Sequence, residues 1–345
     1  MDKPCFFDLD KTELAAKLTD WQEPAYRFGQ IWQSVYKDLN FSPETFSTLS
    51  KTLRTRLAES YCFDPVIPDK VMNSEDRETS KLLFKLQDGK KIEAVLMRYL
   101  DRNTICISTQ VGCPMNCAFC ATGQMGFTRN LSRGEIVGQV MYFAKQLKDE
   151  GKKLTNIVVM GMGEPFHNYD AVMGAMSILN DAEGFQFGER RITISTVGII
   201  PMIEKFTKAH KQINLAVSLH APNDVIRQKI MPADRKYPMT ELMDACRNYT
   251  EVTGRRITFE YALINKLNDS YENASELTHL LKGMLCHVNL IPLNSTDGYE
   301  FKGSPRERVN DFKMVLDRAH IPCSIRLKRG IEIGAGCGQL LSKEE

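Results

Sequence analysis

The chain has 345 residues, of which 43% are hydrophobic and 26% are charged, and its formal net charge is +2. These values are typical of a soluble globular protein with one large domain and a small companion, or with two domains. The charged N-terminus lacks the apolar core of a signal peptide, and no apolar run approaches the roughly 20 residues that span a bilayer. We therefore expect a cytoplasmic protein without a membrane partner.

The first part of the chain, residues 1–75, shows helical periodicity and no clear strand. Three short amphipathic segments predict a small helical domain there: 11–22, 26–39 and 45–61. Asp88-Gly89 then separates two runs of partially alternating hydrophobicity, which predicts a β-hairpin linker over residues 76–100.

The remainder, residues 101–345, alternates between strand-like and helix-like segments. The clearest helix is expected from Ser132, which forms a capping box with Glu135, to Gly151. Repeated strand–helix units predict parallel strands covered by helices, in either a doubly wound sheet or a barrel. The predicted strands are 104–110, 156–161, 191–198, 214–220, 256–264, 287–294 and 323–328.

Three cysteines, Cys113, Cys117 and Cys120, follow the first of these strands in the pattern Cys-x3-Cys-x2-Cys. In either α/β architecture, the carboxyl end of a strand is where ligands bind. Three thiolates on a tight loop can hold three irons of a 4Fe–4S cluster and leave the fourth iron open for a substrate or cofactor. The spacing therefore predicts a reactive iron–sulfur site.

Other interpretations of the three cysteines are less favoured. A structural zinc site needs a fourth ligand, and the nearest histidine along the chain is His167. A simple electron carrier of the ferredoxin type would supply four cysteines. Core cysteines would not be expected in a loop that is marked by Gly112, Pro114 and Gly123.

The cysteine pattern, with Phe119 before its last member, resembles the signature of radical S-adenosylmethionine (radical SAM) enzymes. This resemblance implies a partial (β/α)6 barrel, which agrees with the predicted strands. It also implies that SAM completes the coordination of the fourth iron. Longer phrases resemble the RlmN/Cfr family of RNA adenosine methyltransferases: TQVGCPMNCAFCATGQMGF, GMGEP, ISTVGIIP, VSLHAPND, HVNLIPLN, CGQL and, in the helical domain, EPAYRFGQIWQSVYK.

The family resemblance assigns roles residue by residue. It implies cluster binding by the three cysteines and SAM binding by a second set, each at a predicted strand end: Gly163, Glu164, Ser195, Ser218, Leu219, His220 and Asn294. Taken alone, Ser195 or Asn294 would be interpreted as a residue that forms a loop hydrogen bond. GMGEP would not bind a dinucleotide, because Phe166 occupies the third glycine position of that fingerprint.

Cys337 lies between two glycines, which suits an accessible reactive thiol, whereas Cys106 alone would be interpreted as a core residue. The family resemblance implies that Cys337 accepts a methyl group from one SAM, and that a radical formed from a second SAM activates that methyl group for addition to adenine. Cys106 then attacks the Cys337 sulfur, which forms a disulfide and releases the product. Glu93 matches the proposed proton acceptor; otherwise it would be an exposed strand carboxylate.

The resemblance implies methylation of carbon-2 of an adenosine in 23S rRNA and in tRNA by a monomer that receives electrons from a partner such as flavodoxin. The sequence GEPFHNY favours the RlmN branch over carbon-8 methylation, because the Cfr pattern has alanine after the glutamate. Rivals outside the family are a radical SAM activase and a non-catalytic RNA-binding protein with a structural metal.

The sequence before Cys337 departs from the family pattern. It reads IEIGAGC, in which Gly334 and Gly336 replace the acidic, alanine-containing segment that usually precedes this cysteine. The two glycines predict a looser loop.

Overall fold

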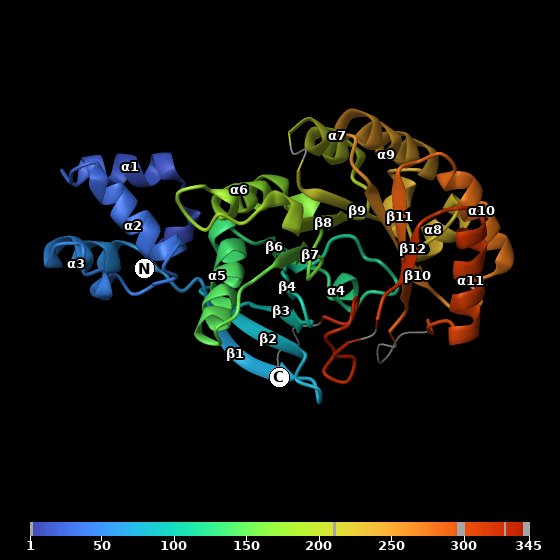
Figure 1. The fold of residues 1–345 in the computed structure, drawn as a ribbon, viewed down its shortest axis with the longest axis horizontal. Helices are drawn as coiled ribbons and strands as arrows, with labels where there is room; N and C mark the ends of the chain where they lie inside the picture. Colours follow the sequence, from blue (N-terminus) through green and yellow to red (C-terminus); the bar gives the residue numbers. More distant parts are fainter. Residues whose placement is uncertain (1–2, 210–211, 295–300, 328, 341–345) are drawn as a thin grey trace.

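The computed structural model describes residues 3–209, 212–294, 301–327 and 329–340. Its centre is a ten-stranded sheet in the order β1-β2-β3-β4-β7-β8-β9-β10-β11-β12. Longer helices lie along the outside of the curved sheet, and α4 lies on its inner side (Figure 1). The strands are β1 (Val66–Asn73), β2 (Thr79–Leu86), β3 (Lys91–Arg98), β4 (Asn103–Cys106), β5 (Gln110–Gly112), β6 (Phe127–Asn130), β7 (Asn156–Val159), β8 (Ile192–Thr196), β9 (Asn214–Ser218), β10 (Ile257–Leu263), β11 (Cys286–Pro292) and β12 (Cys323–Ile325).

The helices follow the predicted alternation with the strands. They are α1 (Lys11–Asp20), α2 (Tyr26–Tyr36), α3 (Lys51–Ser60), α4 (Ala121–Gln124), α5 (Arg133–Asp149), α6 (Tyr169–Asn180), α7 (Ile200–Ala209), α8 (Asp224–Ile230), α9 (Met239–Thr253), α10 (Tyr271–Leu281) and α11 (Arg306–Arg318). No helix among the described residues combines the length and apolar character that crossing a bilayer requires.

Strands β4 and β7 to β12 pair in parallel, and each parallel connection passes through at least one helix. Six such crossovers give the partial (β/α)6 barrel that the family resemblance implied. All seven strands predicted in this part of the chain are present, although the first ends at Cys106 and the last at Ile325, both earlier than predicted, and residue 328 lies outside the described residues. Parallel strands bring all their carboxyl ends to one edge, where a site can form.

The N-terminal part contains the three predicted helices, α1 to α3, which form a lobe beside α5 (Figure 1). The expectation of no strand before residue 75 is wrong, because β1 (Val66–Asn73) pairs antiparallel with β2. Its signal is weak: the strand contains Pro68, its register shifts between Pro68 and Lys70, and most of its residues are exposed. An edge strand of this kind lacks the alternation that marks a half-buried strand.

The predicted hairpin is confirmed. Strands β2 and β3 pair antiparallel around Asp88-Gly89, and Gly89 adopts a φ of +80°. The predicted helix start is also confirmed. In α5, Ser132 Oγ accepts from the Glu135 backbone N–H at 3.1 Å, and the Glu135 carboxylate accepts from the Ser132 N–H at 2.9 Å. Gly151 follows the helix with a φ of +71°.

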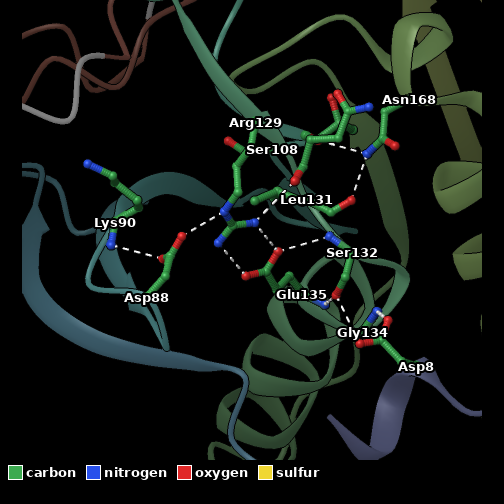
Figure 2. Close-up of polar contacts among 12 residues, drawn as sticks. Asp8, Asp88, Lys90, Ser108, Arg129, Leu131, Ser132, Gly134, Glu135 and Asn168 are labelled. Carbon is green, nitrogen blue, oxygen red and sulfur yellow. Dashed lines mark hydrogen bonds and ion pairs between the residues drawn. The ribbon is translucent and has the colours of Figure 1, made fainter. Parts of the chain in front are cut away.

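Arg129 joins three separate elements near the start of α5 (Figure 2). Its two terminal nitrogens each donate to the Glu135 carboxylate at 2.8 Å, and its Nε donates to Asp88 in the hairpin turn at 2.7 Å. Because Arg129 lies on β6, which pairs with β5, these contacts fix the ribbon that encloses the cysteine loop. Asp8 reinforces the same corner by accepting from the Gly134 N–H at 2.6 Å.

We expect Arg129→Met to lower the free energy of unfolding by about 1–3 kcal/mol, because it removes charge-assisted hydrogen bonds to a half-buried residue and leaves the carboxylate of Glu135 without its fork-shaped partner. Urea unfolding monitored by circular dichroism checks this result. Arg129→Lys keeps the charge but not the bidentate geometry, so its stability should lie between that of wild type and that of Arg129→Met. Equal stability of all three proteins would contradict the anchoring role.

Candidate active site

A cavity opens at the carboxyl edge of the parallel strands, with about 900 Å³ of empty space including its mouth. The cysteine loop forms one wall, and residues at or just beyond successive strand ends form the rest. Nine of the predicted site residues line this cavity: Cys113, Cys117, Cys120, Gly163, Glu164, Ser195, Ser218, His220 and Cys337. These predicted residues come from five separate segments and surround one space, as the predicted barrel required.

The cysteine loop runs between β5 and β6 and is held against the barrel on its apolar side. The Ala118 N–H donates to the Ile230 carbonyl at 2.9 Å, and Cys117 packs in a small buried cluster with Ile230, Met231 and Leu293. No three His, Cys, Asp or Glu side chains of the described residues surround a single metal position. A 4Fe–4S cluster binds each thiolate through a different iron, so its ligands need to line a cavity rather than meet at one point.

The surroundings of the three thiols disfavour the thiolate form unless a cationic group such as a metal lies beside them. Burial raises the pKa of Cys113 to about 12, and burial with the two neighbouring thiols raises the pKa of Cys117 well above its usual value. The thiols are therefore protonated at neutral pH until a metal displaces their protons. A loop with three such thiols facing one cavity fits an iron–sulfur cluster.

Glu164 is buried in the cavity wall with both carboxylate oxygens hydrogen-bonded. Oε1 accepts from the Phe166 N–H at 2.9 Å, and Oε2 accepts from the Val197 N–H at 2.8 Å. Burial nevertheless raises the pKa of Glu164 to about 7. A buried carboxylate of this kind favours a nearby cation or ammonium group, which fits the predicted position of the SAM amino group.

We expect this carboxyl to make the metal-free protein less stable at higher pH. The folded pKa lies above the usual 4.5, so the protonated form is favoured in the fold and its stabilisation is lost as the pH rises from about 4.5 through about 7. Wild type should lose about 3 kcal/mol more than Glu164→Gln between pH 4.5 and 7.5. Urea unfolding across this range measures the difference, and parallel pH profiles would contradict it.

Gly163 is required by close packing beneath Glu164. Its φ is +104°, and a Cβ at this position would lie 2.6 Å from Gln110 Cβ. Gln110 in turn accepts from the Glu164 N–H through Oε1 at 2.8 Å. The glycine therefore allows the turn that aims Glu164 into the cavity.

His220 is a neutral imidazole that can donate a hydrogen bond from its ring. Its Nδ1 accepts from the Ala262 N–H at 2.9 Å, and its ring packs edge-on against Phe119 of the cysteine loop with centroids 4.9 Å apart. Burial lowers the pKa of His220 to about 3, so the proton resides on Nε2. Leu219 is fully buried and does not line the cavity; its carbonyl accepts from the buried guanidinium of Arg227 at 3.1 Å.

Cys106 and Cys337, which lie 231 residues apart in the sequence, line one small pocket beside the main cavity. Cys106 ends β4 and is buried, and Cys337 is half-buried in the C-terminal loop. Both thiols are free in this structure. Burial, followed by the neighbouring Cys337, raises the pKa of Cys106 to about 12. The structure therefore brings the two predicted working thiols together.

The C-terminal loop is tied directly to the segment that follows the cysteines. The Gly338 carbonyl accepts from the Ala121 N–H at 2.8 Å, and the Leu340 carbonyl accepts from Thr122 Oγ1 at 2.7 Å. The departure from the family pattern has a structural use, because Gly334 adopts a φ of +64° and a side chain at Gly336 would overlap the Asn294 amide. Asn294 contacts this loop and does not line the main cavity.

Glu93 is buried, so the alternative of an exposed strand carboxylate is wrong. Its carboxylate forms an ion pair with Lys81 Nζ at 2.9 Å. Glu93 does not line the main cavity, but it lies on the same face of β3 as Val95, which lines the pocket of the two thiols. Lys81 was not singled out in the sequence, because a lysine in a hairpin strand is most often exposed.

Two more charged residues face the cavity. Glu260 lies on β10 and accepts from Asn289 at 2.8 Å, and Arg326 follows β12. The neighbouring Cys337, and then Glu260 and Cys106, raise the pKa of the Arg326 guanidinium. A carboxylate within the apolar run ITFEYALI was a usable sequence signal for Glu260. Arg326 had only a local gathering of basic residues to mark it.

Comparison with known proteins agrees with this geometry. The model of the radical SAM superfamily matches residues 107–277. A relative in Dictyoglomus turgidum, named as a probable dual-specificity RNA methyltransferase RlmN, is 45% identical over 95% of this chain and 94% of its own length. The dual-specificity RNA methyltransferase RlmN 1 of Myxococcus xanthus is also 45% identical, over 98% of this chain and 94% of its own.

A solved structure, described as a radical SAM methyltransferase from Sphaerobacter thermophilus, superposes with a TM-score of 0.96 at 49% sequence identity. The match covers 98% of this chain and 99% of the other, so it includes the N-terminal helices and the C-terminal loop as well as the barrel. The cysteine-lined cavity therefore belongs to an enzyme, and the chain is a member of the RlmN family of radical SAM methyltransferases.

Proposed function

We propose that this enzyme methylates carbon-2 of an adenosine in 23S rRNA and in tRNA, using two SAM molecules per turnover. The observation that carries the proposal is the position of Cys337. Its loop meets the cysteine-lined cavity on one side and the pocket of Cys106 on the other. A methyl group on the Cys337 sulfur would be within reach of both, as synthesis of a carbon–carbon bond on a poorly nucleophilic ring carbon requires.

The residues of the chain divide the work. Cys113, Cys117 and Cys120 would hold a 4Fe–4S cluster, and Glu164, Ser195, Ser218, His220 and Asn294 would hold SAM at or beside it. When bound, these groups would supply the methyl group and the one-electron chemistry that protein side chains lack. An external reductant such as flavodoxin would supply the electron, and the enzyme would work as a monomer.

Cys337 would carry the methyl group as a thioether and present it to the adenine ring. After the methylene carbon has joined the ring, Glu93 would accept the ring proton. Cys106 would then attack the Cys337 sulfur, which breaks the carbon–sulfur bond and forms a disulfide, while the released carbon keeps the bonding electrons and takes up a proton to become the methyl group. An external thiol reductant would reduce the disulfide before the next turnover. Burial holds the Cys106 thiol in its protonated form at neutral pH, and the cationic Arg326 acts in the opposite direction by favouring the thiolate.

Mass spectrometry of adenosines from enzyme-treated RNA tests the proposal. The purified enzyme, with cluster, SAM and reductant, should add one methyl group at carbon-2 of an adenosine in a 23S rRNA fragment and in tRNA. A product methylated at carbon-8 would replace the carbon-2 assignment. Absence of any methylated adenosine, while SAM is still cleaved, would contradict the RNA substrate.

A further inference from the structure

Cys337 lies where separate cavities meet. Besides the cysteine-lined cavity and the pocket of the two thiols, another pocket with about 410 Å³ of empty space reaches Cys337 and Arg326, and we call it the second pocket. No cysteine of the cluster loop lines it. Both residues also line the first cavity. Because the cluster and SAM would occupy the first cavity, a second reactant that must reach the Cys337 sulfur has the second pocket as a separate approach.

Arginine side chains gather in and beside the wall of the second pocket. Tyr99 lies beside it, and two guanidinium groups approach the Tyr99 ring: Arg102 Cζ is 4.3 Å from the ring centroid and Arg329 Cζ is 4.4 Å from it. Arg326 lines the same pocket. We call Tyr99, Arg102, Arg326 and Arg329 the arginine rim.

The charges of the arginine rim are only partly neutralised. Arg329 forms an ion pair with Glu78. In the described part of the chain, neither Arg102 nor Arg326 has a carboxylate within ion-pair distance, and Arg102 is exposed. Arg102 is exposed beside the polar pocket and Arg326 lines it, and guanidinium groups without ion-pair partners can bind anionic oxygens in two-point contacts.

We propose that the arginine rim binds the sugar–phosphate backbone of the RNA beside the target adenosine, and that the second pocket is the entrance through which the adenine reaches Cys337. This inference rests on the proposed RNA substrate. Proteins recognise unstacked nucleotides with basic groups along the backbone and with aromatic or guanidinium planes against the bases. The rim combines both kinds of group at the opening that leads to the reactive sulfur.

Arg102→Gln is the sharpest variant. The side chain is exposed, and its only described side-chain contact is the one with the Tyr99 ring, so the fold does not depend on it. RNA affinity should fall about fivefold at 100 mM KCl, and the slope of log K against log salt should decrease by about 0.7–0.9, as loss of one phosphate contact predicts. Filter binding of the full-length enzyme to a 23S rRNA fragment measures both quantities.

The matched control is Arg308→Gln, which removes an exposed arginine on α11, and its affinity and slope should equal those of wild type. The Arg102→Gln effect should be the same for a fragment in which the target adenosine is replaced by uridine, because backbone contacts carry no sequence information. Cleavage of SAM without RNA should be unchanged in Arg102→Gln.

An unchanged affinity and slope in Arg102→Gln would overturn the proposal. So would normal RNA binding with slower cluster reduction by a protein donor but not by dithionite, because the rim would then be a docking site for the donor. Binding is measured without turnover. A wild-type enzyme that methylates no RNA would therefore contradict the proposed function, while the binding comparison would still decide the role of the rim.

Discussion

Cys106→Ala should accumulate as a covalent protein–RNA species that survives a denaturing gel and disappears after RNase treatment. Methylation of Cys337 and addition of its methylene carbon to the adenine do not use the Cys106 thiol, so both steps should proceed. Release of the base does require a second thiol beside the Cys337 sulfur, and among the described residues Cys106 shares a pocket with Cys337 without being a predicted cluster ligand. Turnover should therefore stop at the adduct.

The matched control is Cys337→Ala, which should show no adduct because it lacks the sulfur that carries the methyl group. Tryptic mass spectra should show S-methylcysteine at position 337 in wild type. Normal turnover by Cys106→Ala would contradict the assignment of the two thiols. Failure of that variant to form the adduct despite a methylated Cys337 would contradict it as well.

Cys117→Ala should abolish iron loading and all cleavage of SAM. Two remaining thiolates cannot hold a stable 4Fe–4S cluster, and Cys117 is the most buried of the three cysteines. Iron analysis, the visible absorption of anaerobically reconstituted protein and the yield of 5′-deoxyadenosine measure the loss.

Cys62→Ala, in the N-terminal lobe outside the cavity, should keep its iron and its cleavage activity. This control separates loss of a ligand from a general effect of removing a thiol. A Cys117→Ala protein that still produces 5′-deoxyadenosine in full yield would refute the cluster assignment.

The sequence by itself determined the strand–helix alternation, because most strands of the barrel are short apolar runs that are followed by segments of helical periodicity. The capping box of Ser132 and Glu135 and the Asp88-Gly89 turn are examples, since both depend on residues within a few positions of each other. The cysteine spacing and the phrases around it also predicted the family. Local patterns of this kind need no knowledge of distant parts of the chain.

Strand β1 and the burial of Glu93 depended on tertiary structure. β1 is stabilised by pairing with β2. Because most of its residues are exposed, its sequence lacks the hydrophobic alternation that would predict a strand. Glu93 is buried because Lys81 lies on the neighbouring strand and neutralises its charge. Neither the pairing of β1 with β2 nor the ion pair can be predicted from the sequence of one segment alone.

The arrangement of the site was likewise decided by the fold. Cys106 and Cys337 meet only because six crossovers return the chain to the edge where β4 ends, and because Gly334 and Gly336 allow the C-terminal loop to turn there. Arg326 faces both thiols and Glu260 for the same reason. Sequence spacing carries no information on such contacts, because the parallel sheet, rather than the chain between them, sets the distance between residues at its strand ends.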